Sequence, residues 1–288
     1  MRFIEQNNCK ITYHRNHTNL GFDRNCDVAI RHSRTKWTWL FGDDDLMPPG
    51  SLKFIIESLQ HLTKQIRFVT VQSNLYSPDM RITLVDCSRE YPRDLVFSGI
   101  SDFSAKFYNK FNFMGHLIFE TSLWAKTANL EKYIGSQIVH VYFVLYWISK
   151  KEQIAFLNRV CIHQRSGASI RSANEMFSII FGCLHDRKEM VYDLFKFDSE
   201  RQILLRSFFY FQKFALLLFK QSESNYNLIS KRDVALFFEA KNAYYFIPAF
   251  WIYYLPQLLL PSFFSKKLVS IFNAVRKSFG EVSSRFNT

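Results

Sequence analysis

The chain has 288 residues, of which 48% are hydrophobic and 22% are charged, so it can bury a core and is not a disordered protein. Its formal charge of +12 attracts polyanions, but the absence of an Arg/Lys-rich run and of zinc-finger spacing argues against nucleic acid. Its five cysteines are widely spaced without a Cys-x-x-Cys pair, which argues against a disulfide scaffold or a zinc site and favours a reducing cytoplasm.

The first 80 residues alternate between strand-like and helix-like patterns. The predicted elements in chain order are a strand at 10–14, a helix at 22–33, a strand at 37–41, a helix at 51–62 and a strand at 67–76. Apolar residues recur at helical spacing in both helices, and Ser51 is placed to cap the second. The alternation predicts the α/β class with a central sheet.

The remainder divides into a mixed part and a helical part. The predicted elements are a strand at 116–120, a helix at 136–149, and either two short strands or one bent strand over 153–158 and 160–164. Long helical patterns rich in aromatic residues follow from about residue 172. We therefore expect two regions, an α/β domain at 1–171 and a helical region at 172–288.

The sharpest local feature is the aspartate cluster at the end of the apolar strand 37–41. Gly42 is followed by Asp43, Asp44 and Asp45, and a proline turn then leads into the next helix. Ligands bind at this edge of open α/β sheets, and adjacent carboxylates need a counter-charge such as Mg²⁺ or Mn²⁺ shared with substrate phosphates. The alternative is a solvated acidic turn that caps the following helix, and the position after an apolar strand favours the metal site.

The segment from Lys10 to Leu52 resembles the nucleotide-binding half of family-2 glycosyltransferases that build O-antigen and capsule, especially the abequosyltransferase-like subgroup. The resemblance implies a GT-A-like mixed sheet with Mg²⁺ or Mn²⁺ as cofactor. It places Asn19, Gly21, Asp43 and Asp44 at the nucleotide-sugar donor. The metal-binding acid aligns best on Asp44, and Asp45 is taken with it as a metal ligand, although the choice between Asp43 and Asp45 as partner stays open.

The same resemblance implies roles for three residues of the second half. His140 lies where the family carries the acidic catalytic base, and the alternative is a core histidine with a hydrogen-bond partner. Arg165 lies where the family binds the leaving diphosphate, although a surface turn explains it slightly better. His116 lies where the family lines the acceptor cleft.

Family members begin with strands that hold the base and the ribose, and we find no counterpart of those strands in this sequence. The resemblance therefore implies a GT-A-like sheet that lacks its first strands. From this we expect weak nucleotide binding and no sugar transfer by the 288-residue chain on its own.

The C-terminal region suggests contact with a membrane. Residues 243–264 contain no charged residue but three prolines, and the basic segment after them has apolar residues on one helical face. We interpret this region as an interfacial anchor; the alternative is a packed helical subdomain.

The sequence thus predicts an inverting, metal-dependent glycosyltransferase that moves a sugar from a nucleotide-sugar donor to a lipid-linked surface-polysaccharide acceptor. Its expected location is the cytoplasmic face of the bacterial inner membrane. The leading alternative is a catalytically inactive remnant or a non-catalytic partner subunit, and an unrelated metal-dependent phosphotransfer enzyme ranks third.

Overall fold

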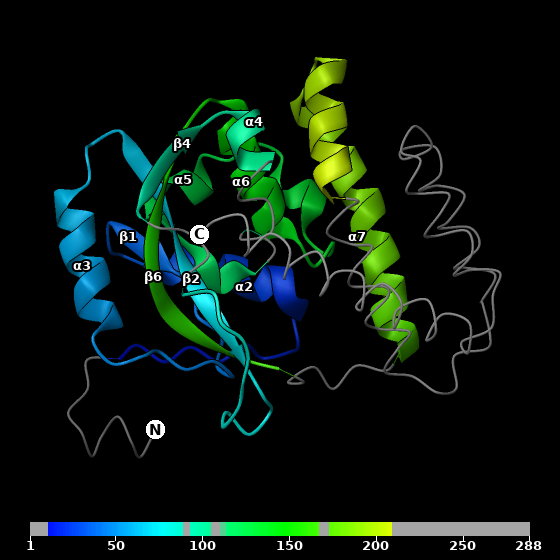
Figure 1. Ribbon diagram of the computed structural model, residues 1–288. Coiled ribbons are helices and arrows are strands. Elements are labelled where there is room, and N and C mark those ends of the chain that lie inside the picture. The colour runs from blue at the N-terminus through cyan, green and yellow to red at the C-terminus, as the bar shows by residue number, and fades with distance from the viewer. Residues whose placement is uncertain (1–10, 89–92, 105–110, 112, 167–172, 209–288) are drawn as a thin grey trace, which may run out of the picture.

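The computed structural model describes residues 11–88, 93–104, 111, 113–166 and 173–208. In this part of the chain a mixed sheet lies between helices on its two faces (Figure 1). Helix α3 covers one face, α6 covers the other together with α2 and α5, and α7 packs against α6 on the outside.

The sheet has six strands in the order β1-β5-β2-β6-β4, with β3 paired to the far end of β2. Their bounds are Trp37–Trp39 (β1), Ile66–Tyr76 (β2), Thr83–Val85 (β3), Leu95–Ser98 (β4), Leu117–Glu120 (β5) and Gln153–Arg165 (β6). Strand β2 is parallel to β6, and β5 is antiparallel to both β1 and β2. Strands β1, β2 and β6 therefore run in one direction, and their carboxyl ends lie at one edge of the sheet together with the start of β5.

Helices connect several of these strands along the chain. The long ones are Gly21–His32 (α2), Ser51–His61 (α3), Val139–Ser149 (α6) and Ala173–Leu194 (α7), and the short ones are Ile100–Asp102 (α4), Met114–His116 (η3), Thr121–Ala125 (α5) and Leu130–Tyr133 (η4). Helix α2 returns the chain to the start of β1, and α6 returns it to the start of β6. The first turns of α2 and α6 therefore lie towards the edge at which β1, β2 and β6 end.

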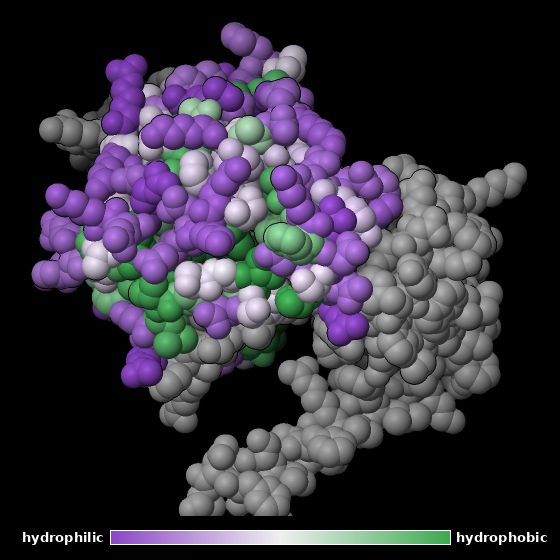
Figure 2. All heavy atoms as spheres, turned by 90° about the horizontal axis from the view of Figure 1, so that it is seen from above, coloured by the Kyte–Doolittle hydropathy of each residue, from purple (hydrophilic) through white to green (hydrophobic). Residues whose placement is uncertain are grey.

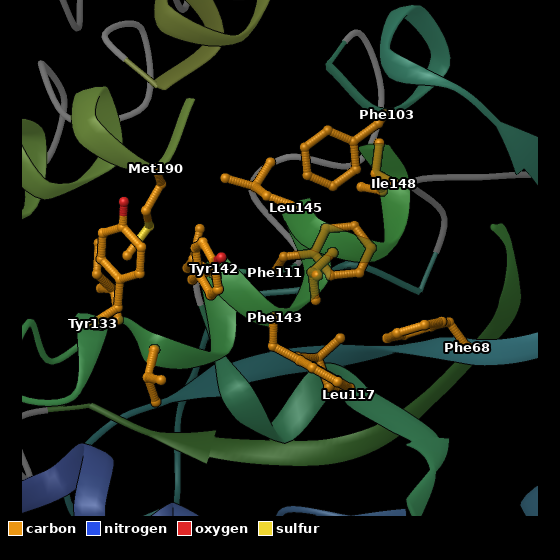
Figure 3. Close-up of a cluster of buried hydrophobic side chains, with 14 of the residues drawn as sticks. Phe68, Phe103, Phe111, Leu117, Tyr133, Tyr142, Phe143, Leu145, Ile148 and Met190 are labelled. Atoms are coloured by element: carbon orange, nitrogen blue, oxygen red, sulfur yellow. The ribbon is translucent and has the colours of Figure 1, made fainter. Parts of the chain in front are cut away.

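The main core lies between the sheet and α6 and is built largely from aromatic side chains (Figure 3). The Phe143 ring lies 5.2 Å from Phe68, 4.7 Å from Phe119 and 4.8 Å from Trp124, measured between ring centroids. The same cluster includes Met190 and Val191 of α7. Much of the high aromatic content therefore serves burial, and α7 shares the core of the α/β part.

The opposite face of the sheet carries a smaller core against α3. Val69, Val71 and Ile118 point to this side, whereas their neighbours Phe68 and Phe119 point to the main core. This alternation is the period of two that a strand with both faces covered requires. The apolar runs of the strand sequences follow from this double burial.

Most elements predicted from the sequence are confirmed. The helices at 22–33 and 51–62 are α2 and α3, and the strands at 37–41, 67–76 and 116–120 are β1, β2 and β5. The two segments after 153 form the single strand β6, whose register against β2 shifts near Gln72. The bent single strand is therefore the correct one of the two alternatives.

Three local predictions are wrong. Residues 11–14 form no strand, because the segment lies along α2, with the His14 ring on His32 and Asn16 bonded to Asn25. Ser51 does not cap α3, whose N-cap is Gly50 at a φ of 80°. The helix expected from residue 136 begins only at Val139.

Beyond residue 172 the helical character is confirmed as far as the structure describes it, through α7 and a further helix from residue 198 to 208. Within the described residues, none of the helices has both the length and the apolar character needed to cross a bilayer. The predicted anchor over 243–288 lies outside the described residues.

Candidate active site at the carboxyl edge of the sheet

The aspartate loop follows β1 and is attached to the end of β6. Leu46 and His163 exchange two backbone hydrogen bonds of 3.0 and 2.8 Å, which form an isolated antiparallel bridge. The loop therefore lies against the last residues of β6 and is fixed at its carboxyl side. This attachment places the three aspartates at the edge where β1, β2 and β6 end.

Two of the three carboxylates converge over Gly42. A Cβ atom at Gly42 would lie 2.7 Å from Oδ1 of Asp44 and 2.9 Å from Oδ2 of Asp45, distances that real Cβ atoms do not tolerate. A side chain at this position would displace at least one of the two oxygen atoms. Asp44 and Asp45 therefore approach the same small region of space.

The end of β6 holds this loop through Arg165. Its backbone N–H donates to Asp45 Oδ1 over 3.1 Å, and its guanidinium donates to the backbone oxygens of Asp44 over 3.0 Å and of Pro78 over 2.8 Å. One side chain thus joins the aspartate loop to the turn that follows β2. The residues 167–169 that follow it in the expected diphosphate loop lie outside the described residues.

The local electrostatics are those of an acidic site in need of a cation. Burial raises the pKa of Asp45; the backbone N–H of Arg165 opposes this shift, and the negative charge of Asp44 adds to it. Two carboxylates held close together carry a repulsion that a divalent cation removes, and carboxylate oxygens are its preferred ligands. The pair Asp44–Asp45 therefore fits Mg²⁺ or Mn²⁺.

The described residues contain no group of three or more His, Cys, Asp or Glu side chains placed to hold a metal ion. Two protein carboxylates are nevertheless the usual number for Mg²⁺, which takes its other ligands from water and from substrate phosphates. An ion held by these two carboxylates would therefore take its remaining ligands from water and from substrate and would not be enclosed by protein.

The aromatic ring of Tyr76 and the imidazole of His163 lie beside the aspartate loop, and the sequence offered little reason to expect them to be neighbours. The rings of Tyr76 and His163 lie 4.5 Å apart, and the Tyr76 hydroxyl is 3.5 Å from Nε2 of His163. Burial lowers the pKa of His163, which favours a neutral imidazole. Their neighbourhood follows from the parallel pairing of β2 with β6, a contact that residue spacing alone does not reveal.

His116 occupies the same edge at the start of β5, but it is buried. Its Nε2 atom lies 2.7 Å from the Ser73 hydroxyl, and the Trp39 indole donates to the neighbouring Gly115 backbone oxygen over 2.7 Å. The exposed fraction of His116 is 6%. The structure places it in the floor of the site and not on an open acceptor surface.

A second group of predicted residues surrounds the first turn of α2. A cavity of about 460 Å³ is lined by the turn before α2 and its first residues, namely Asn16, Thr18, Asn19, Leu20, Gly21, Phe22 and Asn25. Asn19 Oδ1 accepts the Gly21 backbone N–H over 2.9 Å, and Gly21 has a φ of 72° that glycine adopts without strain. The predicted donor residues Asn19 and Gly21 thus form one wall of a polar cavity.

His140 lies behind this cavity in the first turn of α6. The Phe22 ring stands edge-on to its imidazole at 5.8 Å, and the exposed fraction of His140 is 3%. The structure thus brings Asp44, Asp45 and Arg165 into one group and Asn19, Gly21 and His140 into another. Asp43 lies on the same loop and is exposed, as is Asp44, whereas Asp45 is half-buried.

Comparison with known proteins gives a match for the N-terminal part of the chain. Residues 2–107 match the family described as Glycosyl transferase family 2, a segment that contains the Asn19–Gly21 turn, α2, β1 and the aspartate loop. No curated protein matches the chain. The match supports a glycosyltransferase, a class that takes nucleotide-sugar donors. Residues 2–107 are therefore similar to the Glycosyl transferase family 2 domain, and the open sheet of parallel and antiparallel strands with its helices is a GT-A-like fold.

Proposed function

We propose that this protein is a metal-dependent glycosyltransferase whose Asp44 and Asp45 hold a divalent cation on the diphosphate of a nucleotide sugar. One observation carries the proposal, namely the convergence of these two carboxylates over Gly42 at the carboxyl edge of the sheet. It supports Asp45 as the partner of Asp44. The site lies inside the segment that matches the glycosyltransferase family.

The protein's own residues have distinct tasks in this proposal. Asp44 and Asp45 supply anionic ligands, Gly42 leaves the space for them, and Arg165 fixes the loop that carries them. The bound cation would neutralise charge on the departing diphosphate. The polar wall formed by Asn19 and Gly21 supplies neutral hydrogen-bonding groups to the donor.

Binding with and without metal tests this proposal. We expect calorimetry to show that UDP, GDP or dTDP binds the full chain in the presence of Mn²⁺, and that EDTA abolishes the binding. The reason is that the carboxylate pair repels a diphosphate unless a cation lies between them. Binding that persists unchanged in EDTA would show that the nucleotide is held without Asp44 and Asp45.

We assign the catalytic base of an inverting transfer to His140. The support is its position in the first turn of α6, separated from the donor cavity by the Phe22 ring. For the imidazole to reach an acceptor hydroxyl, this ring must move aside. We assign His116, which is buried against Ser73, a supporting task and not a direct contact with the acceptor.

Replacing His140 with glutamine tests the base. A general base contributes about 10²–10⁴-fold to rate, so turnover of a sugar nucleotide should fall by that order while nucleoside diphosphate affinity stays the same. His61 on the exposed side of α3 provides the control, because His61→Gln should change neither quantity. Equal turnover by His140→Gln and the wild type would assign the base elsewhere.

We further propose that the acceptor is a lipid-linked surface saccharide and that the chain contacts the cytoplasmic face of a bacterial inner membrane. The support comes from the sequence beyond residue 242. Residues 243–264 carry no charge, and residues 265–288 contain Lys266, Lys267, Arg276, Lys277 and Arg285 against the single acid Glu281. Basic residues beside an apolar face bind anionic headgroups.

Vesicle binding tests the membrane contact. The full chain should co-sediment with vesicles that contain phosphatidylglycerol, and a chain that ends at residue 242 should remain in the supernatant. Salt should release part of the full chain, because it screens the attraction of the basic residues. The assignment of the membrane contact to this segment would be refuted if both chains co-sedimented with the vesicles to the same extent. It would also be refuted if the full chain did not co-sediment at all.

A further inference from the structure

The first turn of α2 carries a buried carboxylate that points away from the donor cavity. Asp23 has an exposed fraction of 2%. Its Oδ2 atom accepts the backbone N–H groups of Gly135 over 2.8 Å and of Gln137 over 2.7 Å, and its Oδ1 atom accepts that of Val139 over 3.2 Å. All three donors belong to the five-residue turn that leads into α6.

This turn depends on an acceptor from outside. Gly135 has a φ of 104° and Gln137 a φ of 66°, so the backbone is held in left-handed conformations. Such turns direct backbone N–H groups into one concavity, which suits an anion. The N-cap of α6 is Ile138, whose side chain cannot accept a hydrogen bond, so the first N–H of the helix needs another partner. Asp23 supplies it from a different helix.

The first turn of α2 thus contacts both the donor cavity and the start of α6. Residues Asn19 to Phe22 line the donor cavity, and Asp23 directly after them holds the start of α6. His140 follows Val139 and packs edge-on to Phe22. The position of the imidazole relative to the donor cavity is therefore fixed by two neighbouring residues of α2.

We propose that Asp23 is a positioning residue that fixes the turn 135–139 and thereby sets His140 against the donor cavity. This proposal rests on the proposed function for its catalytic consequence, but its structural part stands alone. Asp23 touches neither donor nor acceptor. It acts through the three backbone N–H groups that lead to the base.

Asp23→Asn is the informative variant because the amide has the shape of the carboxylate but only one acceptor oxygen. At least one of the three N–H groups then faces an amide NH₂ and loses its partner. We expect hydrogen exchange at residues 135, 137 and 139 to accelerate by about tenfold or more. The NMR signal of the His140 imidazole should move, and kcat should fall about tenfold while the Mn²⁺-dependent affinity for UDP, GDP or dTDP is retained.

Asp27 is a matched control on the same helix. It is also buried and accepts hydrogen bonds from the Trp124 indole and from Arg31, but it has no contact with the turn 135–139. Asp27→Asn should lower stability without changing exchange in that turn, the His140 signal or kcat. Equal effects of the two variants on these three readouts would overturn the proposal, because they would show a general loss of stability.

The unmodified chain provides a test that does not depend on how the variant folds. The amides of residues 135, 137 and 139 should exchange slowly in the wild type, since each donates to a buried carboxylate. Exchange at the rate of unprotected turn amides would refute the positioning role directly. A wild type that binds no nucleoside diphosphate in the presence of Mn²⁺ would count against the proposed function, and the exchange and NMR results would still decide the role of Asp23.

Discussion

Asp44→Asn is expected to weaken the Mn²⁺-dependent binding of a nucleoside diphosphate by at least about 100-fold. Replacing a residue that only supports a metal ligand lowers metal affinity by about 10- to 100-fold, and loss of the ligand itself should cost more. The substitution keeps the shape of the side chain and removes one of the two negative charges that converge over Gly42. Asp45→Asn should have a similar effect for the same reason. Isothermal titration with UDP, GDP and dTDP measures the change.

Asp43 supplies the control for this prediction. It lies in the same loop, carries the same charge and is the alternative partner of Asp44. With Asp45 as the partner, Asp43 acts on the ligand only through screened attraction, so Asp43→Asn should change the affinity by no more than about threefold. A larger loss in Asp43→Asn than in Asp45→Asn would identify Asp43 as the partner of Asp44.

Arg165→Lys and Arg165→Ala should weaken the same binding to a similar degree, by about tenfold. The guanidinium holds the backbone oxygens of Asp44 and Pro78 at once, and a lysine ammonium cannot reproduce this fork. Each lost hydrogen bond removes about 0.5–1.5 kcal/mol from the loop that carries the carboxylates. Titration of both variants separates this role from direct contact with the diphosphate.

The two roles of Arg165 differ in what lysine should do. If the side chain bound the diphosphate through its charge, lysine would retain most of the affinity and alanine would lose it. Arg159 on the same strand is the control, since its guanidinium lies over the Phe54 ring, 4.7 Å from the centroid. Arg159→Lys should leave nucleotide binding unchanged.

The elements that the sequence predicted well are those with a strong local pattern. Helix α2 shows apolar residues at helical spacing, and β1 is an apolar run that ends at Gly42. The failed predictions depended on partners far along the chain. Ser51 has the chemistry of a cap, but the turn places Gly50 there, and α6 starts late because Asp23 holds residues 135–139 in another conformation.

The candidate site shows the same division. Residue type and position after an apolar strand were enough to propose a metal site at Asp43–Asp45, but the approach of the Asp44 and Asp45 carboxylates to one region depends on the path of the folded loop, which the sequence does not give. The roles of Arg165 and Asp23 could not be predicted, because their hydrogen bonds join residues 87 to 121 positions apart along the chain. From its residue type and position, Arg165 was expected to bind the leaving diphosphate, whereas the residue type of Asp23 indicated no role.

The most direct measurement is a crystal structure of this chain with Mn²⁺ and a nucleoside diphosphate, with the ion located by its anomalous scattering. The proposed function predicts one manganese peak beside the carboxylates of Asp44 and Asp45, with the diphosphate of the nucleotide next to it. The proposal would be contradicted by a manganese ion bound elsewhere on the chain. A nucleoside diphosphate bound at this edge of the sheet without any ion would contradict it as well.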